Sequence, residues 1–202
     1  GAIQVARGEL DLAADLFELS RTVAEINGLQ AQVANAMLGL ASVAQSRGDL
    51  DGSEQLYLRA GALAEAAGDL RTAAMAEQNR GILANIRGDV AEALSRYESA
   101  LARHQALGDD RMSAFTLNNM GMAHVDLGRL KAADRCFREA LELADRCRDT
   151  RVVGMVSLNR AELLLKRRAF SEARETCDYA VEIFNGLGAT PSLAEAHKFY
   201  GI

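Results

Sequence analysis

The feature that most constrains this chain is a short turn segment that recurs at a constant interval of about 40 residues. Its four clear copies are Arg7-Gly8-Glu9-Leu10, Arg47-Gly48-Asp49-Leu50, Arg87-Gly88-Asp89-Val90 and Leu127-Gly128-Arg129-Leu130, and a degenerate fifth copy is Arg167-Arg168-Ala169-Phe170. A second series of marks runs half a period away, at Gly28, Gly68, Gly108, Arg148 and Gly188. A repeat of this length predicts a stack of equivalent units, each too small to bury its apolar face alone.

Each segment between two marks has the periodicity of an α-helix. From Val90 to Leu107, apolar or small residues recur at the i, i+3, i+4 and i+7 spacing of one helix face. The chain has one proline, no tryptophan and only 5% aromatic residues, which suits neither a β-sandwich nor a β-barrel. We therefore expect an all-α fold in which every period is an antiparallel helix pair.

The turn residues have the chemistry of helix ends. Glycine directly after a helix can adopt the left-handed conformation that satisfies the last carbonyl groups. Asp49 and Asp89 are placed to cap the helices that follow, and Asp89 with Glu92 predicts a capping box. Thr190 followed by Pro191 predicts a further helix start.

Small and aromatic residues occupy fixed places in the period. Small residues lie seven before the first turn glycine, five after it and twelve after it, and an aromatic residue lies nine after it. The small residues seven before the glycine are Ala41, Gly81, Gly121 and Ala161. Those five after it are Ala13, Ser53, Ala93, Ala133 and Ala173, and those twelve after it are Ser20, Ala60, Ala100, Ala140 and Ala180. The aromatic positions are Phe17, Tyr57, Tyr97 and Phe137, with Cys177 as the exception. A period near 40 would also fit HEAT or armadillo units, but this order of residues resembles the tetratricopeptide repeat over essentially the whole chain.

The resemblance implies a right-handed α-solenoid of about five antiparallel helix pairs, in which the small residues let helices approach closely and the aromatic fills the space between units. The usual unit has about 34 residues. The longer unit here resembles the repeat arrays of kinesin light chain, polarity adaptors and bacterial transcriptional regulators. The implied units of this single array are about 1–28 (partial), 29–68, 69–108, 109–148, 149–188 and 189–202 (partial). Because Gly1 is in phase with Gly81, we interpret the chain as a fragment of a longer protein.

Composition and charge narrow the classes of function. A formal net charge of -5 provides no basic footprint for nucleic acid, and no window of 18 apolar residues predicts a membrane span. The odd number of cysteines, Cys136, Cys147 and Cys177, favours a reducing cytoplasm over a disulfide framework, and we expect all three to be small buried hydrophobic residues. The prediction is a cytoplasmic protein, and its arginine-rich, alanine-rich composition hints at a bacterial source.

No pattern in the sequence predicts catalysis. His104, His124 and His197 are scattered, and no histidine, cysteine or carboxylate cluster has metal-ligand spacing. His124 is expected to be a core or boundary residue. A nucleophile paired with a base, which an enzyme would need, is also missing from the pattern. The sequence therefore predicts no enzyme activity, no cofactor and no metal site.

The resemblance also implies a working surface, because the first helix of each unit lines the concave groove of such a solenoid. Three asparagines spaced one period apart lie on these helices: Asn79, Asn119 and Asn159. By resemblance, their amides hydrogen-bond the backbone of a bound peptide, since an amide both donates and accepts. The alternative is that they cap neighbouring helix ends or bond to water.

The other positions of the implied groove are mostly apolar or carry amides. They are Met75, Gln78, Ile82, Asn85 and Ile86; Phe115, Asn118, Met122, Val125 and Asp126; and Met155, Leu158, Glu162, Leu165 and Lys166. Such a floor suits an amphipathic helix or an extended apolar peptide. The alternative is that long helices wind tightly enough to bury these side chains against one another. A clamp for a terminal carboxylate is not expected, because its key column holds Leu38, Gln78, Asn118 and Leu158.

Arg80 and Arg160 stand where other units have Leu40, Met120 and Tyr200. One hypothesis is that they recognise an acidic group on a partner. The other, which we favour, is local pairing, because Glu77 lies three residues before Arg80 on the same helix face.

The sequence thus predicts a non-catalytic scaffold that binds a peptide or a helix in its concave groove, as part of a larger bacterial regulatory protein. The partner is another protein or another domain of the same chain. The alternatives are an oligomerisation or spacer module of a regulator, and a receptor for a small signalling peptide. A homodimer through the exposed end repeats is a further expectation.

Overall fold

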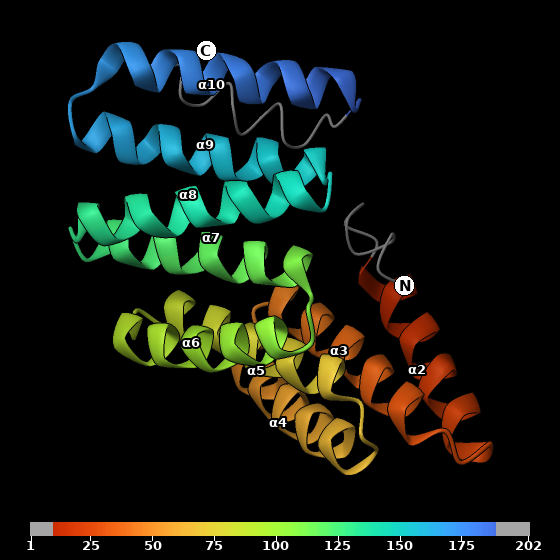
Figure 1. The fold of residues 1–202 in the computed structure, drawn as a ribbon. Helices are drawn as coiled ribbons and strands as arrows, with labels where there is room; N and C mark the ends of the chain where they lie inside the picture. The colour runs from red at the N-terminus through yellow and green to blue at the C-terminus, as the bar shows by residue number, and fades with distance from the viewer. Residues whose placement is uncertain (1–9, 189–202) are drawn as a thin grey trace. The chain divides into compact units, whose positions relative to one another are not determined.

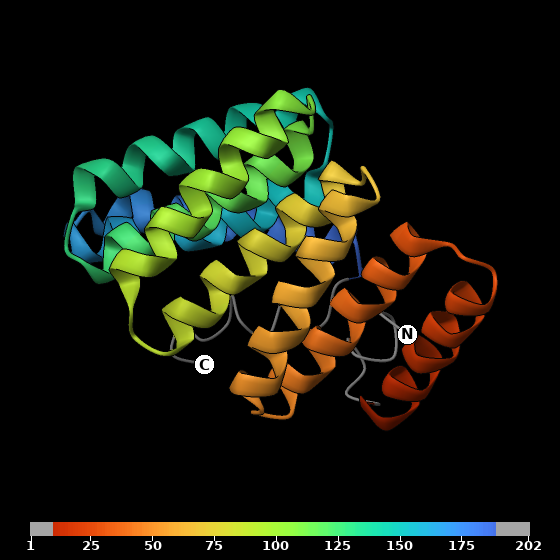
Figure 2. The ribbon, with the colours of Figure 1, turned by 90° about the horizontal axis from the view of Figure 1, so that it is seen from below.

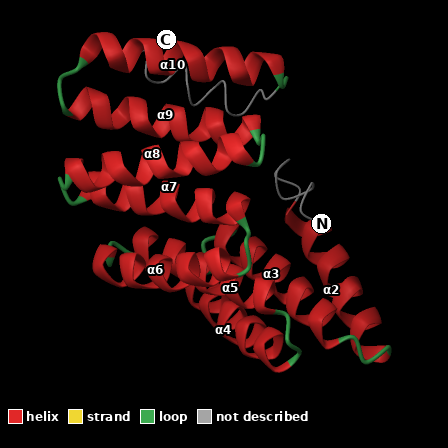
Figure 3. Ribbon diagram, in the orientation of Figure 1, coloured by secondary structure: helices red, strands yellow, loops and turns green. Residues whose placement is uncertain are grey.

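The computed structural model describes residues 10–188, and every regular element in that range is an α-helix of 17 residues (Figures 1 and 3). The helices are α2 (Leu10–Ile26), α3 (Gln30–Ser46), α4 (Leu50–Ala66), α5 (Leu70–Ile86), α6 (Val90–Ala106), α7 (Asp110–Asp126), α8 (Leu130–Arg146), α9 (Thr150–Lys166) and α10 (Phe170–Gly186). The all-α fold class and the helical repeat are confirmed.

The chain divides into two compact parts, an N-terminal part (Gly1–Leu107) with α2 to α6 and a C-terminal part (Gly108–Ile202) with α7 to α10. Within each part, every helix packs against the next one in an antiparallel hairpin (Figure 2). The first helices of the pairs also touch: α3 contacts α5 in the N-terminal part, and α7 contacts α9 in the C-terminal part. Each part therefore has a face built from first helices, which we term the first-helix face.

The helix ends confirm the role predicted for the turn glycines. All seven turn glycines in the described range have positive φ, from 61° at Gly188 to 84° at Gly88. At the second turn, the Gly48 N–H donates to the Gln45 carbonyl and the Asp49 N–H to the Ala44 carbonyl, each at 3.0 Å. This pair of hydrogen bonds satisfies the last free carbonyls of α3.

Two arginines take the same left-handed conformation where glycine is missing, Arg148 with φ of 53° and Arg168 with φ of 60°. The hydrogen bonds of the turn persist, since the Arg148 N–H donates to the Asp145 carbonyl at 3.1 Å. The repeat geometry therefore imposes the turn even on a residue whose Cβ disfavours it.

Replacing Arg148 with glycine is expected to raise the free energy of unfolding by about 0.5–1 kcal/mol, because relief of the left-handed strain exceeds the added chain entropy of glycine. The matched control is Arg135→Gly, at an exposed position inside α8, which is expected to lower it by about 1 kcal/mol. Urea unfolding followed by circular dichroism measures both. Two losses of equal size would contradict the strained turn.

Aspartate caps the helices α4, α5, α6, α7 and α9, and the two predicted caps are confirmed. The side chain of Asp49 accepts from the Gly52 N–H at 2.9 Å, and that of Asp89 from the Glu92 N–H at 3.0 Å. The capping box is nevertheless wrong in its second half, because the Asp89 N–H already donates to the Ala84 carbonyl at 2.9 Å. The Glu92 carboxylate pairs with Arg96 instead. Thr190 and Pro191 lie outside the described residues.

The small and aromatic positions pack against one another. The rings of Tyr97 and Phe137 are almost fully buried, and each lies directly on a glycine of the preceding first helix. A Cβ added at Gly81 would lie 2.6 Å from the Tyr97 ring, and one added at Gly121 would lie 2.5 Å from the Phe137 ring. The close helix approach predicted from these residues is therefore present.

The last described pair, α9 and α10, lacks the aromatic residue of the other pairs. Cys177 replaces the aromatic residue and is buried together with Leu158, Ala161 and Phe184. The Phe184 ring lies against Gly154, where an added Cβ would meet it at 3.0 Å. A ring from a later turn of α10 thus packs against an earlier turn of α9, a contact that the sequence pattern did not predict.

Candidate functional site

The predicted asparagine series lies on the first-helix faces of the two parts. Asn79 is on α5 of the N-terminal part, and Asn119 and Asn159 are on the neighbouring helices α7 and α9 of the C-terminal part. All three side chains are half-buried. Each of these asparagines is therefore partly accessible from the surface.

An open cavity of about 240 Å³ lies on the first-helix face of the N-terminal part. Its wall is formed by Phe17, Asn35, Leu38, Gly39, Ser42, Met75 and Asn79. The sequence predicted Met75 and Asn79 but missed Asn35 and Gly39. Gly39 takes the place of the repeated asparagine and exposes the Phe17 ring below it, while Asn35 supplies an amide one turn earlier. The missing asparagine at position 39 was the available signal.

In the C-terminal part, two amides of the predicted surface bond to each other. The Asn159 Nδ2 donates to the Asn118 Oδ1 at 2.8 Å. Asn118 is buried, as are the residues at the same repeat position, Leu38, Gln78 and Leu158. This column lies beneath the surface of the first-helix face.

The remaining predicted groove residues separate by exposure. Met75, Ile82, Asn85, Phe115, Met122, Met155 and Glu162 are half-buried, Val125 is buried, and Ile86, Asp126, Leu165 and Lys166 are exposed at the helix ends. The Arg111 guanidinium lies 5.6 Å from the centroid of the Phe115 ring, and Lys166 pairs with Glu162 at 3.5 Å. The Asn85 Oδ1 is buried and accepts no hydrogen bond from the described residues. An unsatisfied acceptor of this kind favours a ligand donor or water.

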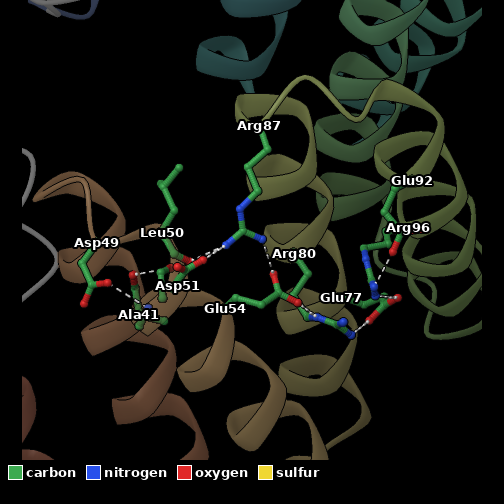
Figure 4. A network of polar contacts seen from close by, with 12 residues as sticks. Ala41, Asp49, Leu50, Asp51, Glu54, Glu77, Arg80, Arg87, Glu92 and Arg96 are labelled. Carbon is green, nitrogen blue, oxygen red and sulfur yellow. Dashed lines mark hydrogen bonds and ion pairs between the residues drawn. The ribbon is translucent and has the colours of Figure 1, made fainter.

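Arg80 engages in local pairing, as favoured from the sequence. Its Nε donates to Glu54 at 2.7 Å and its guanidinium to Glu77 at 3.1 Å (Figure 4). Glu77 also accepts from Arg96 at 3.0 Å. The Arg80 side chain is 16% exposed. Its charge is therefore used inside the fold, and the hypothesis of partner recognition fails at this residue.

The histidines and cysteines differ in environment. His104 is buried and His124 half-buried, whereas His197 lies outside the described residues. Cys177 is buried, and burial raises the pKa of the half-buried Cys136 thiol. Cys147 is exposed, so the expectation of burial is wrong there: it follows the last residue of α8, where the chain turns away from the core.

One carboxylate in the C-terminal part has a lowered pKa. Burial alone would raise the pKa of Asp149, but hydrogen bonds from the Val152 N–H and the Arg111 guanidinium outweigh it and lower the pKa. Asp149 caps α9, so this pKa shift arises from the geometry of a helix end.

Within the described range, no group of three or more histidine, cysteine or carboxylate side chains could hold a metal ion. None of the described helices combines the length and the hydropathy that a membrane span requires.

Comparison with solved structures places the fold among known helical repeats. The chain matches BtubC from P. vanneervenii with a TM-score of 0.74 at 21% identity, over 96% of this chain and 84% of that one. It matches the Rap conjugation gene regulator of plasmid pLS20, solved with the Phr* peptide, with a TM-score of 0.81 at 17% identity, over 98% of this chain and 55% of that one. A signal-transduction ATPase with a tetratricopeptide repeat sensor from Pyrococcus horikoshii matches with a TM-score of 0.75 at 17% identity. The match covers 96% of this chain and 30% of that one.

Sequence comparison matches one part of the chain to a family. No curated protein sequence matches the chain significantly. Residues 71–146 match the family model described as tetratricopeptide repeat. These residues span α5 to α8, and the described helices on either side repeat the same helical element with the same turns. Residues 71–146 are therefore similar to the tetratricopeptide repeat, and the described helices continue the same helical repeat with a unit longer than the usual one of about 34 residues.

Proposed function

We propose that this chain is a non-catalytic scaffold whose first-helix face binds a peptide or a helix of a protein partner. The observation that carries the proposal is the cavity between Phe17, Asn35, Met75 and Asn79, which combines an aromatic ring and a thioether with two amides. Pockets of this composition bind apolar side chains while their polar groups fix the ligand backbone. The Rap conjugation regulator, which shares this fold, was solved with a peptide.

The chemistry of the cavity suits a segment with one large apolar side chain. The half-buried Met75 can adapt to different side-chain shapes because a thioether is flexible and polarizable. The amides of Asn35 and Asn79 lie on neighbouring helices, α3 and α5, where each can both donate to and accept from a peptide unit. Backbone pairing of this kind gives affinity, and the apolar pocket gives selectivity.

Peptide selection from a random displayed library tests this proposal. A peptide selected on the wild-type chain is expected to lose about 5- to 150-fold in affinity with Asn79→Ala, because about 1–3 kcal/mol is lost when a buried polar partner is left unpaired. Titration calorimetry measures the affinity. The matched control is Asn185→Ala on α10, an exposed asparagine away from the first-helix face.

Equal affinities for the wild type, Asn79→Ala and Met75→Ala would contradict binding at this cavity. Failure to select any peptide would favour the spacer interpretation. The assignments to a larger regulatory protein and to the cytoplasm also stay predictions.

The expected homodimer has one supporting observation. Helix α2 exposes apolar side chains at alternating spacings of four and three residues: Leu12, Leu16, Leu19, Val23 and Ile26. This spacing forms one stripe along a helix and suits packing against another helix. Self-association through α2 therefore stays a prediction.

A further inference from the structure

Arg80 on α5 and Arg160 on α9 occupy the same repeat position, but their surroundings differ. Arg80 donates two hydrogen bonds to carboxylates, at 2.7 Å to Glu54 and at 3.1 Å to Glu77 (Figure 4). The Nε of Arg160 is buried and has no hydrogen-bond partner among the described residues. Its ion pair is with Asp134, at 3.7 Å, beyond hydrogen-bond distance.

The repeat itself explains the difference. Asp134 stands at the position of Glu54 and is one methylene shorter, so its carboxylate does not reach the guanidinium. Ser157 stands at the position of Glu77 and carries no charge. Arg80 is thus neutralised by two carboxylates, whereas Arg160 has only one, and that one is more distant.

A second arginine of the C-terminal part, Arg167, also lacks the carboxylate partner that its counterpart in the N-terminal part has. Arg87 pairs with Asp51 at 2.7 Å and donates to the Leu50 carbonyl at 3.1 Å. Arg167 occupies the position of Arg87, but the place of Asp51 is taken by Lys131. Among the carboxylates of the described helices, Arg167 reaches only Asp134, at 3.9 Å.

Asp134 is therefore surrounded by excess positive charge. It faces three guanidiniums, those of Arg138 at 3.5 Å, Arg160 at 3.7 Å and Arg167 at 3.9 Å, and Lys131 lies three residues before it on α8. We term Lys131, Arg138, Arg160 and Arg167 the α8–α9 basic cluster. Among the described residues, the three arginines of this cluster share the single carboxylate of Asp134. The corresponding network of the N-terminal part sets three arginines against four carboxylates: Arg80, Arg87, Arg96, Asp51, Glu54, Glu77 and Glu92.

One member of the cluster, Arg160, borders an open space. Arg160 lines a groove of about 330 Å³ formed by α8, α9 and α10, together with the hydroxyl-bearing residues Ser157, Thr176 and Tyr179. Asp145 and Glu175 also line this groove, so an anionic group is expected at its Arg160 side, away from these carboxylates. Because Arg160 has unused hydrogen-bonding capacity, a ligand oxygen would complete it.

We propose that the α8–α9 basic cluster is a binding site for a phosphate-type oxyanion. A dianionic phosphate group would balance most of the excess charge, and the planar guanidiniums can each donate two parallel hydrogen bonds to its oxygens. The Ser157 and Tyr179 hydroxyls of the groove supply additional donors, whereas the Thr176 hydroxyl donates to the Glu172 carbonyl at 2.7 Å. The site uses residues other than those of the cavity on the first-helix face, so it stands independently of the peptide-binding proposal.

Titration of the whole chain with inorganic phosphate, followed by phosphorus NMR at low ionic strength, tests the site. We expect saturable binding that weakens by roughly tenfold or more with Lys131→Asp and with Arg160→Gln, because each removes cationic donors. Lys131→Asp restores the arrangement that the N-terminal part already contains around Arg87, so the fold is expected to persist and circular dichroism verifies it. The matched control is Arg174→Gln on α10, an exposed arginine whose partner is Asp178 at 3.9 Å.

A five-residue alanine peptide with a central phosphoserine separates the two sources of the anion. Tighter binding of this peptide than of inorganic phosphate assigns the site to a phosphorylated side chain, whereas equal binding assigns it to a free phosphate compound. The unphosphorylated peptide must not bind at the cluster. Absence of saturable phosphate binding by the wild type, or equal affinity in Lys131→Asp, Arg160→Gln and Arg174→Gln, overturns the proposal.

Discussion

Replacing Phe137 with alanine is expected to lower the free energy of unfolding by about 3–5 kcal/mol. The ring is fully buried and rests on Gly121, with 2.5 Å between its edge and the place where a Cβ would be. Because Gly121 has no side chain, nothing on α7 can move into the space that the ring leaves. The cost therefore includes both lost apolar burial and a persistent cavity between α7 and α8.

The matched control is Phe170→Ala, the same substitution at a residue that is 65% exposed at the start of α10. It is expected to change the free energy of unfolding by less than about 1 kcal/mol. Urea unfolding monitored by far-ultraviolet circular dichroism compares the two variants with the wild type. Losses of similar size in both variants would show that the ring of Phe137 does not hold the helix pair together.

Replacing Arg80 with alanine is expected to lower the free energy of unfolding by about 1–3 kcal/mol, because two hydrogen bonds to charged groups are lost. The carboxylates of Glu54 and Glu77 are only 18% and 23% exposed, so solvent cannot fully replace the guanidinium. Arg96 still pairs with Glu77, and Arg87 lies 3.8 Å from Glu54, which limits the loss.

Arg160→Ala is the matched control, because it removes the same side chain from the same repeat position. Its expected cost is less than about 0.5 kcal/mol, or a small gain, since the Asp134 carboxylate retains Arg138 and Arg167 nearby. Thermal unfolding at matched ionic strength distinguishes the two variants. A larger loss at Arg160 than at Arg80 would mean that Arg160 is already satisfied in the fold, which would also count against the oxyanion site.

The repeated pattern of the sequence was sufficient for the fold class, because each prediction rests on chemistry within one helix pair. Gly48 and Asp49 end one helix and begin the next through bonds to residues close to them in the chain. Gly121 and Phe137 belong to a single pair, α7 and α8, so their contact also follows from the period. Local rules of this kind transfer from one unit to the next.

The failures have equally specific causes. The capping box at Asp89 did not form because the preceding turn had already used the N–H that Glu92 would have accepted. Burial of Cys147 was inferred from residue type, whereas its place directly after α8 exposes it. The cavity near Asn35 was missed because Gly39 interrupts the asparagine series, and the interruption itself was the only signal in the sequence.

The sequence by itself determined the all-α fold, the helices with their turns and caps, and the pairing of small with aromatic residues, because the period repeats every one of these local interactions. Only the tertiary structure decided which polar side chains remain available. Asn159 is bonded to Asn118, Arg80 is neutralised by Glu54 and Glu77, and the Arg160 Nε has no hydrogen-bond partner among the described residues. The physical reason is that availability depends on distances between side chains of neighbouring helices. A difference of one methylene, as between Glu54 and Asp134, changes a hydrogen bond into a distant ion pair.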